Sequence, residues 1–96
     1  MSSKTRPYRD ALLEALSDPD EAAHYLNAAI EDSPEMFLKA LRNVAQSRQM
    51  TNVAKRAGVT RESLYRATSL TGNPTLDTLS SVLGALGLKI RIEADV

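Results

Sequence analysis

The stretch Met50–Thr68 constrains the fold more than any other part of the chain. Its sequence, MTNVAKRAGVTRESLYRAT, predicts two short helices separated by Gly58. A helix-turn-helix needs a small residue where its helices cross, and Ala54 meets that need. Four positions later it needs a turn residue that tolerates positive φ, which is Gly58. Apolar residues that would dock both helices on a core occupy the remaining inward positions: Val53, Ala57, Val59 and Leu64.

Helices are also predicted before this stretch. Residues 8–16 form a short amphipathic pattern, and Asp18-Pro19 and Ser33-Pro34 each place a capping side chain before a proline that suits the first helical position. Glu21 stands where a capping-box carboxylate would reach back. The apolar stripes of the two capped helices have helical spacing and comprise Ala22, Tyr25, Leu26, Ala29 and Ile30, then Phe37, Ala40, Leu41, Val44 and Ala45.

Three threonines mark the helices that follow. Thr51, Thr60 and Thr75 are predicted N-caps, and Gly87 is a predicted left-handed C-terminal cap. Gly84 lies inside the last helix, where we expect close packing against a neighbouring helix or another subunit. The stripe of that helix comprises Leu76, Leu79, Val82, Leu83 and Leu86.

The C-terminal residues alternate between apolar and polar. Leu88-Lys89-Ile90-Arg91-Ile92-Glu93 predicts a half-buried strand. A lone strand edge needs a partner, and we expect its own copy across a two-fold axis, with Leu88, Ile90 and Ile92 in the dimer interface. The alternative is addition of the strand to the sheet of a partner protein.

Charge is segregated along the chain although the net charge is zero. Residues 18–35 hold six acids and no Lys or Arg, whereas residues 48–67 hold five bases and one acid. This asymmetry favours an acidic and a basic surface with different partners. Two ordinary solvated faces are the alternative.

Several functional classes find no support in the sequence. The chain has no Cys, one His (His24) and no glycine-rich phosphate loop, so we expect no enzyme, no cofactor and no metal site. No apolar run approaches the roughly 18 residues of a membrane span. The first ten residues lack the apolar core of a secretory signal, so we expect no membrane partner and a cytoplasmic location.

The region from Met50 to Leu88 resembles the Cro/C1-type (XRE) family of DNA-binding domains. The resemblance rests on the helix-turn-helix pattern, on the loop Gly72-Asn73-Pro74 and on the ending Ala85-Leu86-Gly87. The acidic Asp-Pro helix, the Phe-Leu-x-Ala-Leu helix and RESLYRA are similar to a narrower group, the addiction-module antidotes of RelE/ParE-type toxin systems. The chain departs from the family at Asn52, where a longer Gln is common.

The resemblance implies roles for individual residues. Base contacts in the major groove would come from Arg61, Glu62, Tyr65 and Arg66, because an Arg fork can take both acceptors of a guanine. For Glu62 the alternative is favourable charge at a helix start. Phosphate contacts would come from Asn52, Thr60, Ser63 and Asn73. A basic toxin would bind the acidic helices, with Asp20, Glu21 and Glu31 as candidate contacts.

The sequence therefore predicts an all-α, lambda-repressor-like (XRE) helix-turn-helix domain with a short C-terminal β-strand. The expected divisions are an N-terminal helical extension over residues 1–32, the DNA-binding domain over 33–87 and a dimerisation strand over 88–96. The expected function is binding of a double-stranded operator as a homodimer, with repression of its own operon and neutralisation of a RelE/ParE-like toxin. A stand-alone regulator and a protein–protein interaction module that does not bind DNA are the alternatives.

Overall fold

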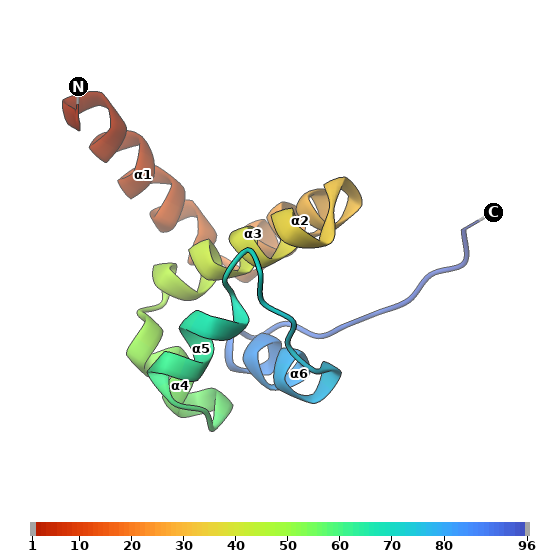
Figure 1. Ribbon diagram of the computed structural model, residues 1–96. Coiled ribbons are helices and arrows are strands. Elements are labelled where there is room, and N and C mark those ends of the chain that lie inside the picture. Colours follow the sequence, from red (N-terminus) through yellow and green to blue (C-terminus); the bar gives the residue numbers. More distant parts are fainter. Residues whose placement is uncertain (1, 96) are drawn as a thin grey trace.

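Six helices make up the described part of the chain (Figure 1). The computed structural model describes residues 2–95, with side chains from residue 7 onwards. The helices α1, α2 and α3 pack on one another, α4 packs against α5 and α6, and α3 also contacts α4. Their bounds are α1 (Ser2–Leu16), α2 (Pro19–Asp32), α3 (Pro34–Ser47), α4 (Met50–Ala57), α5 (Arg61–Ala67) and α6 (Leu76–Ala85).

The predicted caps before four helices are confirmed. Each capping oxygen accepts a backbone N–H at 3.0–3.1 Å, which satisfies a donor that the helix itself leaves unpaired. Asp18 does so without the predicted box from Glu21, because its own N–H already donates to the carbonyl of Ala15. The four caps are Asp18 for α2, Ser33 for α3, Thr60 for α5 and Thr75 for α6.

Two glycines end helices in the left-handed conformation, as predicted. Gly58 has φ +74° and Gly87 has φ +79°. After Gly87, the N–H of Leu88 donates to the carbonyl of Leu83 at 2.8 Å, which is the long bond of a Schellman motif. A Cβ at Gly84 would meet nothing within 4 Å, so none of the described helices packs closely against it, and packing against another subunit stays a prediction.

Two helix starts differ from the prediction. α4 begins at Met50, before Thr51, so the predicted Thr51 cap is wrong. Its N-cap is Gln49, which has φ +69° and makes no side-chain cap bond. α1 begins at Ser2 rather than at Tyr8. Both differences concern where a helix begins, which a sequence pattern predicts less precisely than the presence of the helix.

One buried cluster receives side chains from all six helices. Leu16, Ala22 and Leu26 join it from α1 and α2, so residues 1–32 contribute to the same core as the helices that follow. The predicted stripes are buried or partly buried except at their outer ends: Ile30 is 54% exposed and Leu76 is 69% exposed.

The predicted C-terminal strand is wrong. No strand occurs in residues 2–95, and the chain after α6 runs away from the helices as an extended tail (Figure 1). Leu88 packs against the core, whereas Ile90 is 44% exposed and Ile92 is 90% exposed. Alternating apolar and polar residues give an extended segment one apolar and one polar face. A β-strand also needs backbone hydrogen bonds to a neighbouring strand. The helices of this chain supply none.

Candidate nucleic-acid interface

The turn after α4 sets how α5 is presented. The N–H of Val59 donates to the carbonyl of Ala54 at 3.0 Å, and Gly58 supplies the left-handed turn. Leu64 then docks α5 on the core with no exposed surface, while Ala57 and Val59 pack at its edge. The predicted docking residues therefore lie on the core. The outward residues Arg61, Glu62 and Arg66 are exposed.

Two guanidinium groups lie over the ring of Tyr65. The Cζ of Arg42 is 5.1 Å from the centroid of its ring, and the Cζ of Arg61 is 5.5 Å from it. Both distances fall within the range of cation–π attraction. A hydrogen bond from Arg61 lowers the pKa of the Tyr65 phenol, and the side chain of Gln46 adds to the effect. Tyr65 is half-buried, so of the four predicted base contacts it is the one turned most toward the protein.

Arg42 fixes the end of α5 to α3, a contact that the sequence reasoning missed. Its Nε donates to the hydroxyl of Thr68 at 3.2 Å, and its Nη2 donates to the carbonyl of Tyr65 at 2.5 Å. Thr68 is 2% exposed and also donates to the carbonyl of Leu64 at 2.9 Å. The only sequence signal for this role is that Arg42 lies off the apolar stripe of its helix.

The predicted phosphate contacts Thr60 and Ser63 form a capping pair at the start of α5. The hydroxyl of Thr60 accepts the N–H of Ser63 at 3.0 Å and donates to its Oγ at 2.9 Å. Arg66 reaches back along the helix and donates to the same Oγ at 3.2 Å. These three side chains are thus brought together on one side of α5.

The two asparagines lie at different places around α5. Asn52 is exposed on the first turn of α4 and donates to the Oε1 of Gln49 at 3.3 Å. Asn73 is exposed and, with Arg66 and Thr75, lines a groove of about 370 Å³ between the end of α5 and the start of α6. Gly72 shapes this loop, because a Cβ there would lie 2.6 Å from the carbonyl oxygen of Ala67. The structure places Asn73 and Arg66 in the lining of one groove, to which Asn52 does not contribute.

The predicted toxin contacts are exposed but spread along α2. Asp20 and Glu21 lie in its first turn and Glu31 near its last residue. At a rise of about 1.5 Å per residue, Asp20 and Glu31 are separated by roughly 16 Å along the axis, on the same side of the helix. They form an acidic edge rather than a compact site.

The described residues form neither a metal site nor a membrane-spanning helix. Within residues 7–95, no three His, Asp or Glu side chains are grouped as a metal site would require, and His24 is exposed on α2. Among the helices described, none is long and apolar enough to cross a membrane.

Comparison with known proteins identifies relatives over most of the chain. The model of a family described as "Probable addiction module antidote protein" matches residues 9–94. An uncharacterized protein of Haemophilus influenzae is 42% identical over 81 residues, which cover 83% of this chain and 84% of that protein. No solved structure matches the chain.

Proposed function

We propose that this chain, which belongs to the family of probable addiction module antidote proteins, is an antitoxin that binds operator DNA through α5. Membership of the family implies a toxin partner in general. The observation that carries the DNA-binding proposal is the presentation of α5: Leu64 is fully buried, whereas Arg61, Glu62 and Arg66 face solvent directly after the Gly58 turn. An XRE-like domain would use such a helix to read bases in the major groove.

Each polar residue around α5 has a distinct part in this proposal. Arg61 and Arg66 would donate to base edges, and Glu62 would accept from a cytosine amine. Asn52, Asn73 and the hydroxyls of Thr60 and Ser63 would hold phosphates. Tyr65 would act through Arg61, because its ring lies 5.5 Å from that guanidinium.

The proposed biological consequence is repression of the operon that encodes the protein. Operators of helix-turn-helix proteins are read by dimers on half-sites about one helical turn apart, so we propose a homodimer on the DNA. The placement of Leu88, Ile90 and Ile92 in its interface stays a prediction. We further propose a basic RelE/ParE-like toxin as the partner of the acidic edge of α2. In this proposal the chain binds no cofactor and catalyses no reaction.

A gel shift tests the DNA-binding proposal. The intact chain is titrated against the DNA directly upstream of its own gene, in excess unrelated duplex, beside an Arg61→Ala variant. We expect a specific complex with the intact chain and a weaker one with the variant. Equal binding to upstream and unrelated DNA, or no binding, would contradict the proposal and favour a protein–protein module.

Binding to the product of the adjoining reading frame tests the toxin proposal separately. Co-purification of the two chains is expected, with loss of the toxin's activity in the complex. If no such partner exists and the gel shift is positive, the protein is a stand-alone regulator.

A further inference from the structure

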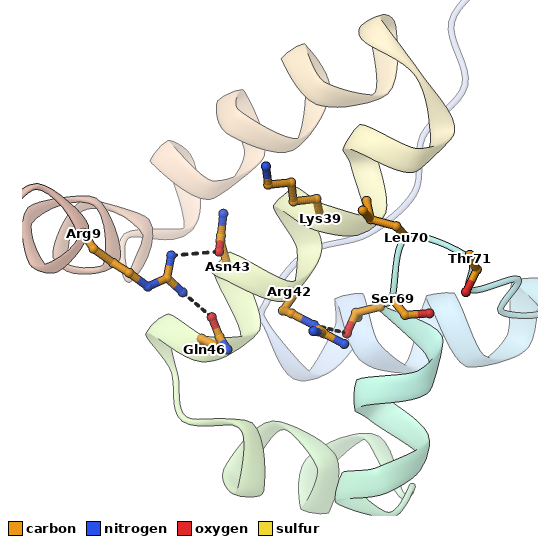
Figure 2. A pocket seen from close by; sticks show the side chains of 9 residues that line it. Arg9, Lys39, Arg42, Asn43, Gln46, Ser69, Leu70 and Thr71 are labelled. Carbon is orange, nitrogen blue, oxygen red and sulfur yellow. Dashed lines mark hydrogen bonds between the residues drawn. The ribbon is translucent and has the colours of Figure 1, made fainter. Parts of the chain in front are cut away.

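A second groove lies between α1, α3 and the loop after α5 (Figure 2). Its volume is about 490 Å³. Arg9 reaches into it from α1, Lys39 and Arg42 line it from α3, and Ser69 and Leu70 close it from the loop. None of the functional roles above uses Arg9 or Lys39.

The groove is positively charged. Three of its lining residues are cations and none is an acid. Arg9 donates to the Oδ1 of Asn43 at 3.3 Å and to the Oε1 of Gln46. Both partners are neutral amides, so they orient the Arg9 guanidinium without cancelling its charge. Lys39 is exposed. Arg42 differs, because its donors are used on Thr68 and on the carbonyl of Tyr65.

The groove lies beside the C-terminal end of α5, and side chains link it to the first turn of that helix. Arg42, which lines the groove, has its Cζ 5.1 Å from the centroid of the Tyr65 ring. Tyr65 in turn lies beneath Arg61, the first residue of α5. Arg42 and Tyr65 therefore join the groove, which Arg9 also lines, to the predicted base-reading surface.

We propose that this groove, through Arg9 and Lys39, holds backbone phosphates of the DNA strand that flanks the bases read by α5. The ligand class is the phosphodiester, which a guanidinium binds with paired N–H donors and an ammonium as a point charge. The inference rests on the proposed DNA-binding function and extends it to the N-terminal helix. An acidic protein segment is the competing occupant, and Leu70, 59% exposed at the rim, would favour it.

Salt dependence distinguishes a phosphate contact from a base contact. Each phosphate neutralised adds about 0.9 to the slope of log K against log salt, and it does so for any sequence. We expect Lys39→Gln and Arg9→Gln each to reduce the magnitude of this negative slope by about one. Between 50 and 200 mM salt, the affinity of each variant would fall about 3–4-fold less than that of the intact chain. Base preferences would stay unchanged.

Two controls isolate the groove. Arg91→Gln removes the same charge from the exposed tail, and Leu70→Ala changes the rim without changing charge. Neither should alter the slope. On duplexes trimmed to the base-read region, the difference between the intact chain and Lys39→Gln should also disappear.

The outcomes separate this inference from the function on which it rests. If the intact chain binds its operator and the slopes of Lys39→Gln and Arg9→Gln equal that of Arg91→Gln, the groove inference alone is overturned. It is also overturned if Lys39→Gln weakens toxin binding and leaves DNA binding intact, because the groove would then be a protein interface. If the intact chain binds no duplex, both proposals fail together.

Discussion

Arg61 and Asn52 have different surroundings, and these predict different parts in DNA binding. Arg61 is exposed on the first turn of α5 and is oriented by the ring of Tyr65. Asn52 is exposed on the first turn of α4, where its amide faces Gln49. A side chain at the start of a groove-entering helix reaches base edges, whereas one on the preceding helix reaches the backbone.

We predict that Arg61→Ala relaxes preference at one base pair in each half-site, at a cost of about 1–3 kcal/mol. Asn52→Ala should weaken binding about equally for all sequences, because a phosphate carries no base information. Titration of both variants against a set of single-base operator variants measures the difference. Unchanged base preferences in Arg61→Ala would remove α5 from the base-reading role.

A second residue-scale prediction concerns the phenol of Tyr65. The hydrogen bond from Arg61 is the largest cause that lowers its pKa from 10.0, because a nearby positive donor favours the phenolate. Its proton should therefore leave at a lower pH in the intact chain than in Arg61→Ala. Phenolate absorbance during an alkaline titration reports this, with Tyr65→Phe to subtract Tyr8 and Tyr25. Arg66→Ala is the matched control, since Arg66 bonds to Ser63 instead. Superimposable curves for Arg61→Ala and the intact chain would contradict the contact.

At the scale of elements, replacing glycine by alanine is expected to change the free energy of unfolding in opposite directions at two positions. A Cβ at either Gly58 or Gly84 would meet nothing within 4 Å, so packing does not distinguish them. Gly58 has φ +74°, which costs an L-residue about 1–2 kcal/mol. Gly84 lies inside α6 and is exposed, where Ala is favoured over Gly by about 0.8–1 kcal/mol. Gly58→Ala should therefore lower the free energy of unfolding and Gly84→Ala should raise it.

Denaturant unfolding of both variants at one protein concentration measures the two signs. A loss of stability in Gly84→Ala that grows as the protein is concentrated would mean that Gly84 packs against another subunit, the second of its two sequence-based explanations. Equal and small changes in both variants would contradict the left-handed turn at Gly58.

The helices were predictable where their ends depend on nearby residues. Asp18, Ser33, Thr60 and Thr75 cap from within two or three positions, and Gly58 needs only its own backbone freedom. The C-terminal strand was not predictable in this way, because a ladder depends on a neighbour that alternation does not specify. For the same reason the link from Arg9 to Gln46 escaped the sequence analysis: the two residues are 37 positions apart.

At the scale of the whole molecule, the charge asymmetry of the sequence becomes a spatial one. The acids Asp20, Glu21 and Glu31 are exposed along α2, whereas Arg61 and Arg66 are exposed on α5. α2 packs on α1 and α3. The negative and the positive side chains therefore lie on separate helices. This arrangement permits a toxin and an operator to use different surfaces of one chain.

We predict that replacing Asp20, Glu21 and Glu31 by Asn, Gln and Gln weakens the toxin complex and leaves operator affinity nearly unchanged. Exposed ion pairs contribute about 0–1 kcal/mol each, so the combined loss should not exceed roughly a hundredfold in affinity. Calorimetric titration with the toxin and a gel shift with the operator measure the two affinities on the same preparation.

Glu31→Gln is the most informative single variant, because the three acids differ in their effect on the fold. Asp20 and Glu21 lie in the first turn of α2, where negative charge stabilises the helix by about 0.3–1 kcal/mol, so their loss also costs stability. Glu31 lies near the other end, where negative charge opposes the helix dipole. Its removal should leave the fold intact or slightly more stable. Weaker toxin binding by Glu31→Gln with unimpaired stability therefore reports a direct contact. The contrary outcome is that Glu31→Gln changes nothing, while the triple variant loses toxin binding, operator binding and stability in parallel. The role of the acidic edge would then be structural.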